Sequence, residues 1–329
     1  MEVICGCPKN DHFRGTLLHV SDNKDGAHDD HSLGLLPTEQ SDPRFANIDH
    51  LPTAELAQLM NETDATVPPA VAKVIPELAE AIDELVKRMR NGGRLHYVGA
   101  GTAGRMAVID AAECPPTFST APGLVNAMMA GGDIALAGAI EGAEDDGSAG
   151  EAAIASESVG PNDTVIGIAA SGRTPFVIAA VAEARRRGAL TVGLSCNHDT
   201  KLSAAAEHAL EVGVGPEFIA GSTRLKSATA QKLVLNMIST ITFVRLNRTH
   251  GNYMVDMQVL NSKLSSRAVR MIGEITGASP QVAHQALEES QNRIKTAIVM
   301  IEHSVDAVTA NERLAIADGR LSTALAAGE

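Results

Sequence analysis

Two acidic segments carry the residues whose types best suit proton transfer. Glu113 lies in DAAECPPTF (110–118) between Ala and Cys side chains, and apolar surroundings raise a carboxyl pKa, which suits a general acid. We expect Pro115 and Pro116 to end the preceding helix and leave Glu113 near the carboxyl edge of a sheet. The segment EGAEDD (141–146) supplies further carboxylates. Spacing does not select Glu144 among them, and a solvated turn is the plain alternative.

A glycine-rich turn, GAGTAG (99–104), follows the apolar run RLHYV and matches the pattern GxGxxG. Dinucleotide binding would require an acidic residue about 20 positions further on, at the end of a second strand. The region near Leu124 has none. We therefore expect Gly101 and Thr102 to form an anion site at a helix N-terminus, where free N–H groups attract a phosphate.

A second loop of this kind is ASGRTP (170–175), which follows the run TVIGIA. Ser171, Gly172, Arg173 and Thr174 bring hydroxyls, amides and a helix dipole together within four residues. The alternative is an ordinary helix N-cap by Thr174. Two such loops at the carboxyl ends of strands in one sheet favour a shared phosphate crevice.

A third segment, GSTRLK (221–226), places basic residues near the expected start of a helix. Ser222 or Thr223 can cap that helix, which leaves Arg224 and Lys226 against the preference of the helix dipole. Such inconsistencies are tolerated at functional sites, so this segment is a candidate for binding an anionic sugar. A surface ion pair is the competing interpretation. His96 alternates within its strand and is expected to pack in the core.

The elements that must position these residues alternate between strands and helices. The expected strands are 94–98, 164–169, 190–194 and 209–214. The expected helices are 70–90, 101–112, 175–187 and 222–245. A helical pattern also begins at Leu51, and at least three more helices are expected from 254 to 325. Such alternation predicts an α/β fold with a parallel sheet flanked by helices. We divide the chain into a flexible leader (1–36), an N-terminal helical segment (37–90), a core domain (91–255) and a C-terminal helical segment (256–329).

Composition excludes several classes of function. With 27 Lys and Arg against 40 Asp and Glu, the formal charge is −13, which argues against binding nucleic acid or anionic membranes. Aromatic residues make up only 2% of the chain, so stacking platforms are not expected. Four cysteines form no CxxC pair. We expect a cytoplasmic protein with reduced thiols and no secretory signal or membrane span. His28 and His31 leave a metal site in the leader as a remote alternative.

The motifs together resemble the N-acetylmuramic acid 6-phosphate (MurNAc 6-phosphate) etherase family. The resemblance runs from about residue 34 to 325. It rests on the motifs GRLHYVGAGTAGR, DAAECPPTF, EGAEDD, IAASGRTP, LSCN, GSTRLKSATAQKLVLNMIST and GNYMVD. Thr38-Glu39-Gln40 also resembles the start of the family's sequences. It implies a sugar-isomerase (SIS) fold and a carbon–oxygen lyase that converts MurNAc 6-phosphate and water to GlcNAc 6-phosphate and D-lactate in peptidoglycan recycling. It implies neither cofactor nor metal.

The resemblance also assigns roles to residues. Glu113 matches the family's proton donor and Glu144 its second acid–base residue, while the loops at Thr102, at 171–174 and at 222–226 match substrate-facing regions. Ala103 departs from the serine that the family often has there, so a hydroxyl contact is in doubt. The resemblance further implies a homodimer whose site is completed by the second subunit.

Two other functions share the same phosphate crevice. A sugar-phosphate sensor related to glucokinase regulators would be expected as a longer chain with two SIS modules. An aldose–ketose isomerase would be distinguished by a ketose phosphate product formed without lactate.

Overall fold

The computed structural model describes residues 34–326. The remaining residues, 1–33 and 327–329, lie outside the described part of the chain. They include most of the expected leader and the possible metal ligands His28 and His31.

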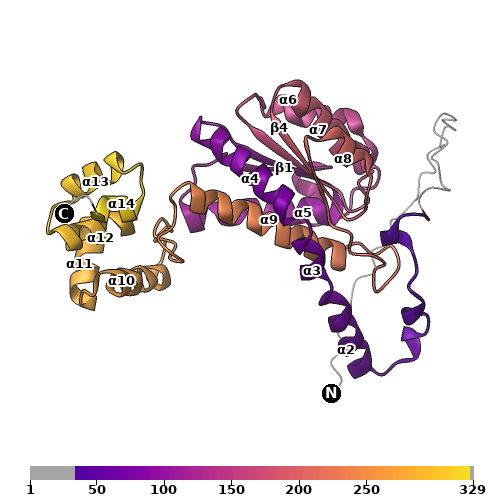
Figure 1. Cartoon of the computed structure of the whole chain (residues 1–329), viewed down its shortest axis with the longest axis horizontal. Coiled ribbons are helices and arrows are strands. Elements are labelled where there is room, and N and C mark those ends of the chain that lie inside the picture. The colour runs from indigo at the N-terminus through magenta and orange to yellow at the C-terminus, as the bar shows by residue number, and fades with distance from the viewer. Residues whose placement is uncertain (1–33, 327–329) are drawn as a thin grey trace, which may run out of the picture.

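A parallel sheet of five strands forms the centre of the molecule (Figure 1). The strands are β1 (Leu95–Gly99), β2 (Val125–Met129), β3 (Thr164–Ile168), β4 (Leu190–Ser195) and β5 (His208–Glu211), in the order β2-β1-β3-β4-β5. In the register, Gly99 pairs with Met129 on one side and with Ile168 on the other. The expected α/β class is confirmed. Strand β2 was not predicted.

Helices cover both faces of the sheet, as the alternating pattern requires. On one face, α4 (Ile75–Arg90), α5 (Gly101–Phe118) and α9 (Lys226–Arg245) share a buried cluster with the strands, joined at its edge by α3 (Val67–Ala72). On the other face, α6 (Gly147–Ser156), α7 (Pro175–Arg186) and α8 (Lys201–Ala205) form a second cluster rich in alanine and valine. His96 of β1 is fully buried, as expected.

Three helix boundaries differ from the sequence-based expectation. The helix expected from Ala70 to Arg90 is divided into α3 and α4, because Pro76 fits only the first turn of a new helix. Helix α5 continues through Pro115 and Pro116 and ends at Phe118. Helix α9 begins at Lys226, four residues after the expected Ser222.

Beyond α9 the chain forms a helical body with its own buried core, seen to one side of the sheet domain in Figure 1. It contains α10 (Ser262–Thr276), α11 (Pro280–Glu289), α12 (Ile294–His303), α13 (Ala307–Ile316) and α14 (Leu321–Ala326). The segment between α9 and α10 is hydrogen-bonded to the end of α5. Ser119 Oγ donates to Asp256 O at 2.6 Å, and Gln258 N donates to Pro116 O at 3.0 Å. The expected helical C-terminus is therefore confirmed.

At the other end, α2 (Thr53–Asp64) projects from the sheet domain (Figure 1). Short 3-10 turns precede it at Pro37–Glu39, Pro43–Phe45 and Ile48–His50. Within residues 34–326 no helix is both long and apolar enough to cross a membrane.

Candidate active site

The strand order creates a crevice at the carboxyl ends of β1 and β3. From β1 the chain passes to β2 on one side, whereas β3, β4 and β5 follow on the other. Ligands in open parallel sheets bind where the order reverses in this way. The turn at Gly101 follows β1 and the loop at Ser171 follows β3. The sheet thus brings the two predicted anion loops to the same edge.

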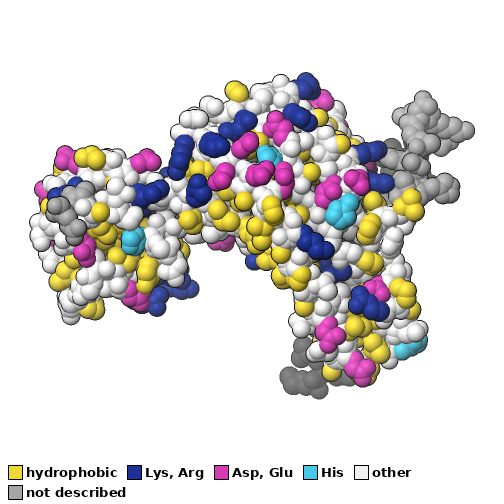
Figure 2. Space-filling model, viewed as in Figure 1, with side chains coloured by type: hydrophobic (Ala, Val, Ile, Leu, Met, Phe, Trp, Pro, Cys, Tyr) yellow, Lys and Arg dark blue, Asp and Glu magenta, His cyan; other side chains and the backbone are white. Residues whose placement is uncertain are grey.

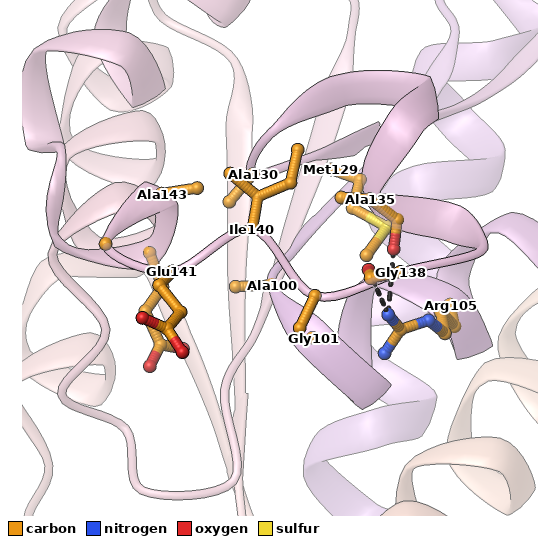
Figure 3. Close-up of a pocket in the computed structure, with 13 residues that line it drawn as sticks. Ala100, Gly101, Arg105, Met129, Ala130, Ala135, Gly138, Ile140, Glu141 and Ala143 are labelled. Atoms are coloured by element: carbon orange, nitrogen blue, oxygen red, sulfur yellow. Dashed lines mark hydrogen bonds between the residues drawn. The ribbon is translucent and has the colours of Figure 1, made fainter. Parts of the chain in front are cut away.

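A cavity of about 240 Å³ opens beside the first of these loops (Figure 3). Gly101 lines it together with Ile140, Glu141 and Glu144. Gly101 has φ +54° and open space where a Cβ would stand, and no side-chain hydrogen bond within the described chain caps α5. The N-terminal amides of α5 and the side of the cavity that carries Glu144 therefore share one pocket.

Arg105, which the sequence analysis did not single out, holds the loop that closes this cavity. Its guanidinium donates to the carbonyl oxygens of Ala135 and Gly138, both at 2.8 Å (Figure 3). It also donates to Leu136 O at 3.0 Å. Arginine presents several donors in a rigid fork, so one side chain from α5 can fix three loop carbonyls. An arginine in the first turns of a helix, where the dipole disfavours it, is the sequence signal that could have drawn attention to it.

The structure gives the acids of EGAEDD different environments. Glu141 and Glu144 line the cavity and are exposed. Asp146 caps α6, accepting from Ala149 N at 2.9 Å and Ser148 Oγ at 2.6 Å, and these hydrogen bonds lower the pKa of Asp146. Gly142, at φ +75°, allows the sharp turn before Glu144.

The Ser171–Thr174 loop is tightly built. Gly172 has φ +66°, and a Cβ there would lie 2.3 Å from Cβ of Thr200, so only glycine fits. Arg173 N donates to Ser171 Oγ at 3.2 Å. Thr174 occupies the N-cap of α7, yet its side chain makes no capping hydrogen bond with the described residues. The capping interpretation of Thr174 is therefore wrong, whereas Pro175 begins α7 as expected.

In the 222–226 segment, Lys226 makes hydrogen bonds within the protein. The buried carboxylate of Glu217 accepts from the backbone N–H groups of Lys226 and Ser227, both at 2.9 Å. The buried ammonium of Lys226 donates to Val214 O at 2.6 Å, and burial lowers its pKa. In this structure Lys226 is part of the packing that starts α9, while Ser222 is half-buried.

Glu113 lies away from the cavity. Because β1 and β2 are parallel, α5 must return toward their amino ends, and 12 residues of helix carry Glu113 about 18 Å from Gly101. It is exposed and is not one of the described residues that line the cavity. The expectation that it lies at the carboxyl edge within an apolar collar is wrong, because α5 runs from that edge back toward the amino ends of the strands and leaves Glu113 exposed.

Comparisons with known proteins agree with this architecture. Residues 77–185 match the glucokinase regulatory protein N-terminal SIS domain, 148–241 the SIS domain, and 251–317 the C-terminal lid domain of glucokinase regulatory protein. A protein of Streptomyces avermitilis named N-acetylmuramic acid 6-phosphate etherase is 52% identical over 295 residues, which cover 90% of this chain and 95% of that protein. The chain belongs to the N-acetylmuramic acid 6-phosphate etherase family.

A second relative and a solved structure are also similar to this chain. The etherase of Rubrobacter xylanophilus is 51% identical over 299 residues, which cover 91% of this chain and 99% of that protein. A solved phosphoheptose isomerase from Francisella tularensis aligns with a TM-score of 0.47 and 17% identity, covering 59% of this chain and all of the isomerase. The etherase family assignment thus extends over both the sheet domain and the C-terminal helical body.

Ala103, where the etherase family often has serine, is buried in the main core. Thr102, its neighbour in the first turn of α5, is half-buried. A polar contact from this turn would therefore come from Thr102 or from the backbone amides.

Proposed function

We propose that the protein cleaves the D-lactyl ether of MurNAc 6-phosphate by eliminating lactate and adding water, which gives GlcNAc 6-phosphate and D-lactate. One observation carries the proposal: a chain of the etherase family places Glu144 in the same cavity as the uncapped N-terminus of α5. The amides there and the Ser171–Thr174 loop would hold the phosphate, and the sugar would extend toward Glu144.

The chemistry follows from the open-chain form of the sugar. Its C1 aldehyde acidifies the C2 proton, and the lactyl oxygen on C3 lies β to that carbon. One glutamate removes the C2 proton while the other protonates the lactyl oxygen as the C3–O bond breaks, which leaves an unsaturated aldehyde and lactate. Water then adds at C3 and a proton returns to C2. We assign the proton-donor role to Glu113 and the other acid–base role to Glu144.

If Glu113 is the proton donor, a second copy of the chain would have to bring it to the cavity. A single chain leaves Glu113 about 18 Å along α5 from the cavity. The two neighbouring helices α5 and α9 carry exposed apolar side chains: Ile109, one turn before Glu113, is 56% exposed, and Ile241 and Val244 on α9 are 41% and 44% exposed. Figure 2 shows hydrophobic side chains gathered along the side of the sheet domain where α9 lies. We propose a homodimer formed through this face, in which each Glu113 enters the site of the other subunit.

Release of D-lactate from MurNAc 6-phosphate tests the reaction. Wild-type protein should release lactate, and Glu144→Gln should lose most of this activity, whereas Asp145→Asn in the same turn should retain it because Asp145 does not belong to the described cavity lining. Substrate binding without lactate release would contradict the etherase function. A ketose phosphate product would instead identify an isomerase.

The dimer has a separate test. Ile109→Asp places a charge in the proposed apolar interface, so we expect a monomer by light scattering with little activity. A monomeric wild-type protein with full activity would refute the second-copy site.

We also propose a cytoplasmic location. Of the described cysteines, Cys114 and Cys196 are free and buried, and burial raises both thiol pKa values to about 12. Unpaired, protonated thiols agree with a reducing compartment.

A further inference from the structure

The segment before the first helix reaches the carboxyl edge of the sheet. Thr38, in the short turn Pro37–Glu39, is fully buried although α2 projects away from the domain. Its carbonyl oxygen accepts from Gly221 N at 3.3 Å. Gly221 immediately precedes Ser222, so the N-terminal segment contacts one of the three segments predicted to face substrate.

The side chain of Thr38 reaches a second one through Asn197. Both hydrogens of the Asn197 amide are used: one goes to Thr38 Oγ1 and the other to Ala170 O, each at 3.0 Å. Asn197 Oδ1 accepts in turn from Thr38 N at 3.4 Å. Asn197 is 1% exposed, so a buried relay connects Thr38 to the residue that precedes Ser171.

Asn197 contacts the Ser171–Thr174 loop through the carbonyl of Ala170, the residue just before it. That carbonyl also accepts from Cys196 N at 2.9 Å, and Gly172 O accepts from Leu202 N at 3.0 Å. The segment that follows β4 therefore holds the Ser171–Thr174 loop at two places. Within residues 34–326 Asn197 donates a side-chain hydrogen bond to the Ala170 carbonyl, and its amide is oriented by Thr38.

We propose that Thr38 is a positioning residue for phosphate binding: it orients Asn197, and Asn197 fixes the start of the Ser171–Thr174 loop. The inference rests on the proposed function only in taking this loop as the phosphate site. Without the Thr38 hydroxyl, one Asn197 N–H would be buried with no acceptor, a costly state that is relieved when the side chain turns. The turn would remove one of the two hydrogen bonds to Ala170 O, leaving that from Cys196 N, and would loosen the loop.

The test compares three variants in the full-length chain. Thr38→Val should raise both the Kd for inorganic phosphate, by calorimetry, and the KM for MurNAc 6-phosphate by about tenfold, with kcat changed by less than about twofold because the glutamates are untouched. Thr38→Ser keeps the hydroxyl and should restore both values. Thr63→Val is the matched control, because it removes a buried threonine hydroxyl bonded to Leu59 O inside α2.

The outcomes separate this inference from the etherase proposal. A lower Tm of Thr38→Val with unchanged Kd and KM would show a purely structural role and overturn the inference, as would a wild-type protein that binds no phosphate. If the wild type releases no lactate but shows the expected pattern of phosphate affinities, the etherase proposal fails and the positioning role stands. Should Thr38→Val not fold, Thr38→Ala tests the same loss of hydroxyl with a smaller side chain.

Discussion

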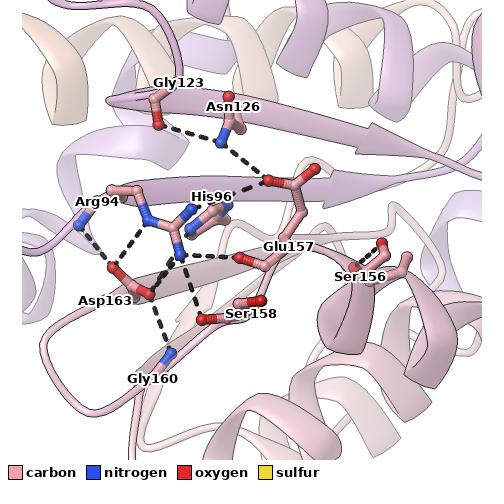
Figure 4. Close-up of polar contacts among 10 residues, drawn as sticks. Arg94, His96, Gly123, Asn126, Ser156, Glu157, Ser158, Gly160 and Asp163 are labelled. Carbon is pink, nitrogen blue, oxygen red and sulfur yellow. Dashed lines mark hydrogen bonds and ion pairs between the residues drawn. The ribbon is translucent and has the colours of Figure 1, made fainter.

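His96 should make the stability of this protein sensitive to mild acid. The ring lies in β1, fully buried, and neither ring nitrogen has a hydrogen-bond partner among the described residues. Burial lowers the pKa of His96 to about 4, assisted by the positive charge of Arg94, while Asp163, 3.9 Å from Nε2, acts in the opposite direction. Figure 4 shows the ring near Arg94 and Asp163, the two charged groups that act on it.

The sign and size of the effect follow from proton linkage. The unfolded chain takes up a proton on this histidine near pH 6.5, the folded chain only near pH 4. Between these values the unfolded state binds more protons, so the free energy of unfolding falls as the pH falls. The full difference across the window is roughly 3 kcal/mol, of which about 2 kcal/mol is lost between pH 7 and pH 5.

Urea unfolding at pH 7 and pH 5 measures this loss. His96→Leu removes the titrating group at similar volume, so the wild type should lose about 2 kcal/mol more than the variant over this interval. Carboxylates such as Asp163, whose pKa is lowered, titrate in both proteins and cancel in the comparison. Equal pH dependences in the two proteins would refute the assignment of a buried, neutral His96.

Further substitutions test the packing around the site. Asp110→Ala should lower the free energy of unfolding by about 3 kcal/mol, because it leaves three buried or half-buried donors on β1 and α9 without their acceptor; thermal unfolding measures this. Gly172→Ala should cost more stability and phosphate affinity than Gly215→Ala, because both have positive φ but only the former drives a Cβ into Thr200; equal costs would contradict the clash. Arg105→Ala should raise the KM for MurNAc 6-phosphate about tenfold by releasing three loop carbonyls, and an unchanged KM would argue against that loop's role.

The sequence predicted those elements whose signals are local. Apolar runs identified β1, β3 and β4, the first two by leading into glycine-containing turns, and Pro175 marked the first turn of α7. Strand β2 was missed because VNAMM contains a single β-branched residue and shows no clear alternation. The start of α9 was misplaced because its N-terminal amides are bound by Glu217, which lies outside any local capping pattern.

The candidate site was predicted in part. Both predicted anion loops lie at the expected edge of the sheet, because the ends of parallel strands fix that position. Choosing Glu144 required the family resemblance, since only the fold shows that Glu144 lines a cavity whereas Asp146 caps a helix. Glu113 was misplaced because a helix that connects two parallel strands returns toward their amino ends, so a residue far along α5 lies away from the edge where the helix begins.

Mixed dimers test the central claim, that Glu113 of one chain acts with Glu144 of another. Glu113→Gln and Glu144→Gln homodimers should each be nearly inactive in D-lactate release. After the two are dissociated together and reassociated at equal concentration, activity should recover to about one quarter of the wild-type rate, because half of the dimers are then mixed and each has one intact site. No recovery, with mixed dimers shown to have formed, would contradict a site shared between two chains.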